Sequence, residues 1–367
     1  MNIIKNIQEP LLELSEVAII PSKQTKIHSR TLECNARMSD GKLPVFVAPM
    51  DCVVDENNFD LFNKDFHAIY PRTIDFYKRV NIMRRYDDSW IAFGLHEVQK
   101  LIKMIDTEMI TLKGRVHICI DQANGHMEDM ITYGKMLRER LIIKDSEIMV
   151  GNIANPRTIT TIAYNDFADW VRIGIGGGSV CTTSVQTGVH YPMASLIAEC
   201  HFYKSTFEFG EKRQLRIIAD GGIGDSGDIC KALALGADAV MCGRLLCAVE
   251  ESAAPWEPLL VYSDGGVEED DDETPARHSM YKQYWGMSTK RAQVRMGGAG
   301  NKNSEGIVDK VFVDSTLAER TEQIESSIKS SMSYCNAYNL NEFRINSVLT
   351  RITPAAYAAY HKEIQNV

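Results

Sequence analysis

The sequence has 367 residues, of which 44% are hydrophobic and 24% are charged, and these proportions are typical of a globular protein with a sizeable core. The length suits either two ordinary domains or one large α/β barrel. A formal net charge of −9 argues against a general nucleic-acid-binding protein, because such a protein requires a basic face.

Neither the apolar runs nor the cysteines indicate a membrane or secreted protein. No apolar run approaches the roughly 18 residues that a membrane-spanning helix needs, and charges interrupt the N-terminal segment too early for a signal peptide. The nine cysteines are scattered and form no Cys-x-x-Cys pair. We therefore expect a cytoplasmic protein with mostly buried, reduced thiols, no zinc site and no membrane partner.

Eight short, apolar, β-rich segments follow one another along the chain. They span residues 44–48, 66–70, 90–94, 115–121, 147–152, 169–174, 215–220 and 238–242. Helix-like stretches lie between most of them, as expected for a parallel sheet that is buried on both faces. Eight such units predict an α/β fold with a (β/α)₈ TIM barrel, as a single domain over residues 1–367. A doubly wound open sheet is the alternative, although no G-x-G-x-x-G motif follows the first strand.

Two later segments depart from this alternation. Residues 263–277 combine a block of acidic side chains with turn-forming residues, which predicts a solvated, flexible excursion. From about Thr316 onward the pattern predicts a C-terminal helix and a tail that pack against the barrel.

Polar residues and glycines follow the predicted strands, where TIM barrels place their catalytic residues. They are Asp51, Asp121, Asn124, Gly125, Gly151, Asn152, Asp220, Gly221, Gly222, Gly243 and Arg244, and the apolar Met50 precedes the first of them. Glycine-rich loops after the last two strands can surround a phosphate with backbone N–H groups, and Asp220 could accept hydrogen bonds from ribose hydroxyls. The same pattern also suits flavin mononucleotide, or tight turns that bind nothing.

The loop after the sixth strand carries a cysteine. Residues 174–188 read GIGGGSVCTTSVQTG, so a run of glycines leads directly to Cys181. Glycine lets a ligand approach the main chain closely, and a cysteine thiolate is a nucleophile. A flavin oxidoreductase needs no cysteine here, whereas an enzyme that forms a covalent adduct with a nucleotide does. An ordinary surface loop remains the alternative.

These segments together resemble the IMP dehydrogenase/GMP reductase family. The family's loop reads roughly G-I-G-P-G-S-x-C-x-T, and other landmarks are matched by LSEVAIIPSK, VAPMDCVVDE, DQANGH, VGNIANP and IADGGI. The resemblance covers nearly the whole chain. It implies a TIM barrel of a kind that commonly forms homotetramers.

Within the family, the sequence is more similar to the GMP reductase branch. Dehydrogenases usually carry regulatory domains after the second strand, where this chain has only the short segment 74–88. They also carry an Arg-Tyr pair on a mobile flap, and residues 287–306 contain no such pair. The segments DQANGH and TGVHYP resemble the reductase.

The resemblance implies NADPH-dependent deamination of GMP to IMP, with NADH as an alternative coenzyme. Cys181 would attack purine C2, and Thr183 with Glu305 would protonate the departing ammonia. The nucleotide would contact Gly178, Ser179, Asp220, Gly221, Gly222, Gly243, Arg244, Gly286, Met287 and Ser288. The coenzyme would lie toward Asp121, Asn124, Gly151, Asn152, Gly174 and Gly176. A monovalent cation such as K⁺ is implied near Gly176, Gly178 and Cys181.

The sequence departs from the family pattern at three places. Gly177 stands where proline is common, Arg244 follows Gly243 where a small residue is common, and residues 70–72 read Tyr-Pro-Arg in place of a His-Lys or His-Arg pair. These departures leave open a modified or deoxy purine nucleotide as substrate. The alternative functions are IMP dehydrogenase, a flavin-dependent barrel, and a catalytically inactive barrel that binds a purine nucleotide.

Overall fold

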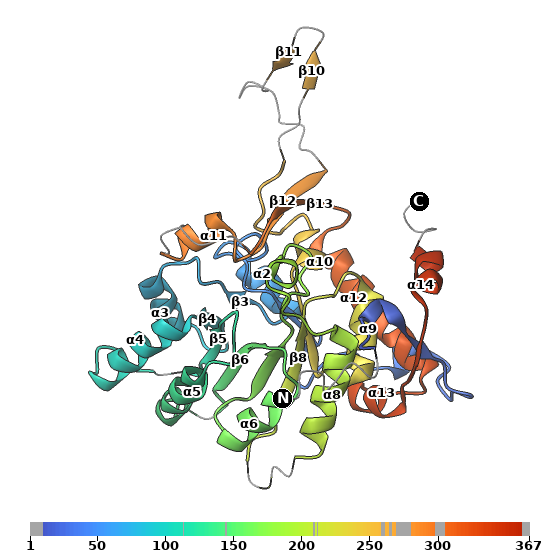
Figure 1. The fold of residues 1–367 in the computed structure, drawn as a ribbon, viewed down its shortest axis with the longest axis horizontal. Coiled ribbons are helices and arrows are strands. Elements are labelled where there is room, and N and C mark those ends of the chain that lie inside the picture. Colours follow the sequence, from blue (N-terminus) through green and yellow to red (C-terminus); the bar gives the residue numbers. More distant parts are fainter. Residues whose placement is uncertain are drawn as a thin grey trace, which may run out of the picture.

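The computed structural model describes most of the chain. The described residues are 10–112, 114–143, 145–207, 210, 212–257, 261–263, 266–268, 280–297 and 305–361. Most of the acidic excursion predicted at 263–277 lies outside them. At its start, β10 (Val261–Ser263) and β11 (Gly266–Glu268) pair in antiparallel fashion, and Figure 1 shows this hairpin projecting away from the rest of the fold.

Eight parallel strands form the centre of the fold. They are β2 (Val45–Val47), β3 (Ile69–Tyr70), β4 (Trp90–Phe93), β5 (His117–Asp121), β6 (Glu147–Ile153), β7 (Trp170–Ile173), β8 (Arg216–Asp220) and β9 (Ala239–Cys242). Their order in the sheet is β2-β9-β8-β7-β6-β5-β4-β3. The ring closes beside β3, where the His67 N–H donates to the Val45 carbonyl and the Val47 N–H to the His67 carbonyl, each at 3.0 Å. The predicted TIM barrel is confirmed, and the open-sheet alternative is wrong.

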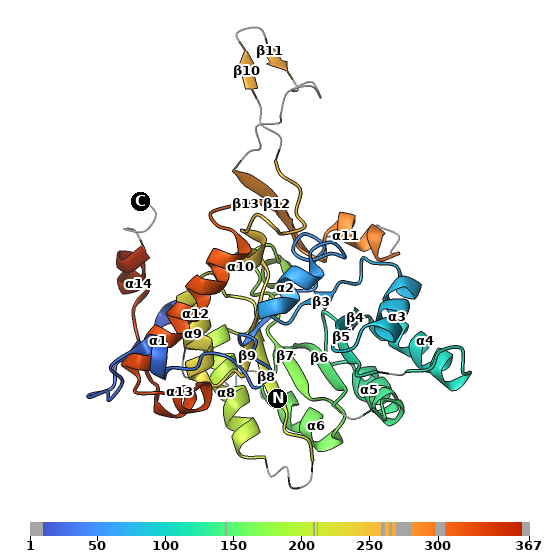
Figure 2. The same ribbon diagram turned by 180° about the vertical axis from the view of Figure 1, so that it is seen from behind.

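Helices lie around the outside of this barrel (Figures 1 and 2). They are α2 (Phe59–Asp65), α3 (Phe76–Arg85), α4 (Leu95–Asp106), α5 (Glu128–Arg140), α6 (Thr158–Asn165), α8 (Met193–Ser205) and α9 (Ser226–Leu235). In α4 the buried residues Leu95, Val98 and Leu101 recur every three positions and so face the sheet together. This spacing explains why the sequence favours a helix there.

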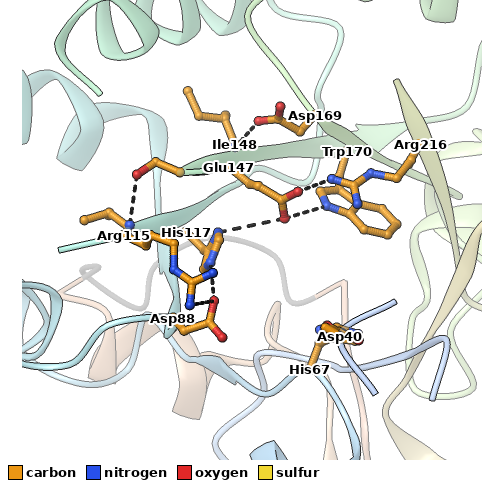
Figure 3. Close-up of polar contacts among 12 residues, drawn as sticks. Asp40, His67, Asp88, Arg115, His117, Glu147, Ile148, Asp169, Trp170 and Arg216 are labelled. Atoms are coloured by element: carbon orange, nitrogen blue, oxygen red, sulfur yellow. Dashed lines mark hydrogen bonds and ion pairs between the residues drawn. The ribbon is translucent and has the colours of Figure 1, made fainter. Parts of the chain in front are cut away.

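Side chains fill the barrel interior completely enough to exclude a pore. Phe46 packs edge-on against Trp90 and Trp170, with ring centroids 5.7 and 5.1 Å apart, at the N-terminal end of the strands. Beyond these rings lies the polar layer shown in Figure 3, in which His117, Glu147 and Arg216 contribute side chains. This polar layer lines a cavity of about 190 Å³. TIM barrels place their chemistry at the opposite, C-terminal end of the strands.

The two ends of the described chain pack together on one side of the barrel. Strand β1 (Val17–Ile20), which follows the short helix η1 (Leu14–Glu16), pairs with β14 (Val348–Arg351). The remaining helices here are α1 (Arg30–Glu33), α12 (Leu317–Tyr334), α13 (Leu340–Asn346) and α14 (Pro354–His361). Helix α12 starts at Thr316, whose hydroxyl accepts the Glu319 N–H, and this is where the sequence predicts a helix.

A small set of elements covers the C-terminal end of the barrel. Strands β12 (Tyr281–Trp285) and β13 (Val308–Phe312) form an antiparallel ribbon that the sequence analysis did not predict. The short helices are α7 (Thr183–Thr187), α10 (Arg244–Cys247) and α11 (Lys290–Arg295). In the described part of the chain, every helix is too short or too polar to span a bilayer.

Candidate active site

A cavity of about 460 Å³ lies at the C-terminal ends of the strands. It is lined by the loops after β2, β5, β6, β7, β8 and β9, and by residues from the segments 284–288 and 305. Of the residues predicted to act in catalysis or to bind the nucleotide or the coenzyme, all except Asn124 and Gly151 line it. Asp51 and Gly125, which also follow predicted strands, do not line it. Asn124 instead accepts the backbone N–H of His126 at 3.2 Å, and Gly151 lies opposite Asp121 in the sheet.

Cys181 is the thiol that this cavity reaches. It is partly exposed, whereas the other eight cysteines are buried. Its Sγ lies 3.3 Å from the Thr183 hydroxyl, and its backbone N–H is bonded to the Gly178 carbonyl at 2.9 Å. Burial raises the pKa of Cys119 to about 12, so that thiol stays protonated and unreactive. Among the cysteines, Cys181 therefore has the accessibility that a nucleophile requires.

Glu305 reaches the cysteine loop through backbone pairing. The Thr182 N–H donates to the Glu305 carbonyl at 2.8 Å, and the Ile307 N–H donates to the Val180 carbonyl at 3.0 Å. This pairing places the Glu305 carboxylate 2.6 Å from the Thr183 hydroxyl, which donates to it. A hydrogen-bonded chain therefore runs from the sulfur through Thr183 to a carboxylate.

Close packing of this region depends on a glycine in the covering segment. A Cβ added at Gly286 would lie 3.1 Å from the Val180 carbonyl oxygen, closer than side chains normally approach. The Gly286 N–H also donates to the Ile307 carbonyl at 3.3 Å. A larger residue at position 286 would push the covering segment away from the cysteine loop.

The glycine loops after β7 and β8 are bonded to each other. The Gly222 N–H donates to the Gly177 carbonyl at 2.9 Å, so this predicted phosphate donor is engaged within the protein. Gly174 has a φ of +127°, which favours glycine, and an added Cβ there would collide with the Asp220 carbonyl oxygen. The backbone of these loops is thus held in place before any ligand binds.

Arg244 lines the cavity, but its guanidinium is directed toward the covering ribbon. Its Nη1 lies 2.7 Å from Asp309 Oδ2, and its Nη2 donates to the Lys310 carbonyl at 3.3 Å. The bond from Arg244 holds the pKa of Asp309 below its ordinary value. This residue, which departs from the family pattern, therefore ties α10 to β13.

A buried arginine that the sequence analysis missed joins two predicted site residues. Arg172, on β7, lies 2.6 Å from Asp121 and 2.7 Å from Asp220, and its side chain is 8% exposed. Asn152 also donates to Asp220, at 2.6 Å. The sequence did carry a signal for Arg172, which is a single cation inside an otherwise apolar strand. A buried charge requires partners of opposite sign, so this position could have been expected to contact acidic residues. Arg72 adds a bond to the Asp121 carbonyl at 3.0 Å.

Asp51 is part of the framework of the site. Its Oδ1 accepts the Trp285 indole N–H at 2.8 Å, and its Oδ2 accepts Arg295 at 2.6 Å. The side chain is only 7% exposed. Asp51 therefore ties the loop after β2 to the ribbon and to α11.

No group of three or more His, Cys, Asp and Glu side chains in the described part of the chain is arranged to hold a metal ion. A monovalent cation near Gly176, Gly178 and Cys181 would need backbone carbonyl ligands, so it remains a prediction. His126, in the loop after β5, accepts the Ala154 N–H at 3.0 Å. His190 lies 2.7 Å from Glu13 and links the cysteine loop to the N-terminal segment.

Comparison with known proteins agrees with this geometry. A family model described as the IMP dehydrogenase / GMP reductase domain matches residues 105–362. The chain belongs to the IMP dehydrogenase/GMP reductase family. This family comprises oxidoreductases that use nicotinamide cofactors and purine nucleotides.

Curated relatives carry the names of both enzymes. An inosine-5′-monophosphate dehydrogenase of Methanocaldococcus jannaschii is 31% identical over 286 residues, which are 74% of this chain and 52% of the relative. One from Helicobacter pylori strain J99 is 30% identical over 344 residues, 87% of this chain and 65% of the relative. A GMP reductase of Buchnera aphidicola is 35% identical over 243 residues, 65% of this chain and 61% of the relative. The matches thus span about half to two thirds of these relatives' lengths.

Proposed function

We propose that the protein catalyses the NADPH-dependent reductive deamination of GMP to IMP and ammonia. The observation that carries this proposal is the hydrogen-bonded chain from Cys181 Sγ to Thr183 Oγ1 at 3.3 Å and on to Glu305 Oε2 at 2.6 Å. A nucleophile and a proton donor meet there at one point of a cavity. Replacement of an amino group on a purine requires both.

The chemistry begins with a bond between the Cys181 thiolate and C2 of the purine. The proton of the Cys181 thiol passes through the Thr183 hydroxyl to the Glu305 carboxylate as the sulfur attacks. Glu305 then returns a proton through Thr183 to the 2-amino group, which is a poor leaving group until it is protonated. Ammonia departs and leaves a covalent adduct on Cys181. The adduct accepts hydride from NADPH at C2, the carbon–sulfur bond breaks, and IMP and NADP⁺ are released. Overall, GMP, NADPH and two protons give IMP, NADP⁺ and an ammonium ion.

The rest of the cavity supplies binding groups for both substrates. Asp220 would accept hydrogen bonds from the ribose, and Gly286, Met287 and Ser288 would contact the base or phosphate. Gly178, Ser179, Gly221 and Gly243 would surround the phosphate. Gly222, whose N–H is bonded to Gly177, and Arg244, whose guanidinium is bonded to Asp309, would line the same end of the cavity. Asp121, Asn152, Gly174 and Gly176 would lie toward the nicotinamide, with Asn124 and Gly151 behind them. We further propose a homotetramer, as in the family.

Two features favour the reductase over IMP dehydrogenase. Only residues 71–89 lie between β3 and β4, where dehydrogenases of the family usually insert regulatory domains. The sequence between Trp285 and Glu305 contains no Arg-Tyr pair with which to activate a water for hydrolysis. IMP dehydrogenase is the second candidate because relatives at 30–31% identity carry that name.

The decisive experiment follows the absorbance of the reduced nicotinamide. We expect NADPH absorbance to fall only when GMP is present, and the Cys181→Ala variant to leave it constant. A parallel reaction with IMP and NAD tests the second candidate. Formation of NADH there, without NADPH loss in the first reaction, would identify a dehydrogenase. No change in either reaction would refute the proposal for GMP.

A further inference from the structure

The Asp220 carboxylate is anchored through one of its two oxygens. Arg172 Nη2 at 2.7 Å, Arg172 Nε at 3.3 Å and Asn152 Nδ2 at 2.6 Å all bond to Oδ2. No hydrogen bond from the described residues reaches Oδ1. Because Asp220 lines the cavity, a ligand hydroxyl can approach Oδ1 while Oδ2 is held by the protein.

Arg172 holds the Asp220 carboxylate from the neighbouring strand of the barrel. Arg172 is on β7, Asp220 ends the adjacent strand β8, and Asp121 ends β5, which only β6 separates from β7. One guanidinium satisfies both carboxylates because its N–H groups diverge in a fixed plane. A lysine ammonium is a point charge and cannot reproduce this double contact.

The charges around Arg172 keep it ionised. Burial disfavours the guanidinium charge, but Asp220 and Asp121 together raise the pKa of Arg172 well above its ordinary value. The other cation at this point is Arg72, whose Nη1 lies 3.7 Å from Asp121 Oδ2. Without Arg172, two carboxylates would share one distant cation, and Asp220 would lose two of its three bonds.

We propose that Arg172 is a positioning residue that directs Asp220 Oδ1 toward the nucleotide's ribose hydroxyls and so determines discrimination between ribonucleotides and deoxyribonucleotides. The identity of the nucleotide rests on the proposed function. The contact between Arg172 and Asp220 does not depend on it. Arg172 itself acts through Asp220 and touches no reacting atom.

The test compares kcat/KM for GMP with that for 2′-deoxy-GMP and 3′-deoxy-GMP. We expect the native protein to prefer GMP over at least one deoxy analogue, because a polar group left without its partner weakens binding. Arg172→Lys should lower kcat/KM for GMP about tenfold more than kcat/KM for the disfavoured analogue, because any loss that arises through Asp121 is common to both substrates. Arg172→Gln should remove more of the preference, and the lysine variant suffices if the glutamine variant does not fold.

A matched control uses another arginine with a buried aspartate partner. Arg138 pairs with Asp169, and the two side chains are 12% and 11% exposed. Arg138→Lys should destabilise the fold without changing the ratio of GMP to deoxy-GMP. A ratio that is unchanged by Arg172→Lys, or a native protein without preference for either hydroxyl, would overturn the proposal.

Calorimetric binding of the three nucleotides separates this inference from the proposed function. If GMP is bound but not turned over with NADPH, the ratio of dissociation constants still reports the role of Arg172. A binding ratio that collapses in Arg172→Lys would support the positioning role even though the reductase assignment had failed. Failure of GMP to bind at all would overturn both.

Discussion

Thr183 and Glu305 are 122 positions apart in the chain, yet the hydroxyl of one donates to the carboxylate of the other at 2.6 Å. The contact forms because residues 305–307 pair with residues 180–182 through backbone hydrogen bonds. The Thr183 hydroxyl thereby joins the Cys181 sulfur to the Glu305 carboxylate, and the position of the carboxylate is set by main-chain geometry. This arrangement makes Glu305 testable as a proton donor.

Glu305→Gln keeps the shape of the side chain and removes its ability to exchange a proton. We expect kcat for GMP reduction to fall by about 10²- to 10⁴-fold, the range that general acid–base catalysis contributes. Calorimetry should show GMP binding close to that of the native protein. Glu139→Gln is the control, because the Glu139 side chain is 73% exposed on the surface. Native kcat in Glu305→Gln would exclude the proposed proton donor.

Cys181 should be the one cysteine that reacts rapidly in the folded protein. It alone among the nine is not buried, and alkylation requires an accessible thiolate. We expect brief treatment with iodoacetamide to add a single group at Cys181, as located by peptide mass spectrometry. GMP should slow the modification, and the Cys181→Ala variant should remain unlabelled. Rapid labelling of another site would show that the buried thiols are more accessible than the packing indicates.

His67 should make the fold less stable in weak acid. Its ring is stacked on Phe46 at 4.5 Å, and burial, opposed by Asp40 3.6 Å away, lowers its pKa from 6.5 to about 4 (Figure 3). Lys42 and Arg216 lower this pKa, whereas Glu147 raises it. Below pH 6.5 the unfolded chain binds the proton more readily than the folded chain does, so stability falls as the pH drops toward 4.

Urea titrations at pH 7 and pH 5 measure this effect. We expect the His67 contribution to the free energy of unfolding to be about 2 kcal/mol smaller at pH 5 than at pH 7. In His67→Phe the loss between these two pH values should shrink by that amount. His67→Gln serves as the second variant if phenylalanine does not fit. Equal pH dependence in native protein and both variants would contradict the prediction.

The ion pair between Asp51 and Arg295 should stabilise the covering segment. The Asp51 side chain is 7% exposed and accepts two hydrogen bonds from described residues, so Arg295→Met leaves the buried carboxylate with the Trp285 N–H as its one donor among them. We expect a loss of about 1–3 kcal/mol in the free energy of unfolding, measured by urea titration. Lys290→Met, at an exposed position of the same helix, should cost less than about 0.5 kcal/mol as a surface change. Equal losses of unfolding free energy in the two variants would show that the Asp51–Arg295 ion pair does not stabilise the fold.

The sequence by itself determined the barrel and most of the site. Each strand is a short apolar run because a parallel strand is covered on both faces, and all eight runs coincide with observed strands. Loops at one end of such strands converge, so the residues after them could be assigned to one cavity. Cys181 and its glycines were recognisable because they form one continuous motif.

Only the tertiary structure decided how these residues are held. The ladder that brings Glu305 to Thr183, the two partners of Arg172, and the contact of Arg244 with Asp309 all join segments distant in the chain. A strand's direction places a residue at an end of the barrel but does not say whether its side chain faces the cavity. That is why Asn124 was assigned to a cavity that it does not line. Such contacts depend on the packing of several loops at once, which local sequence patterns do not encode.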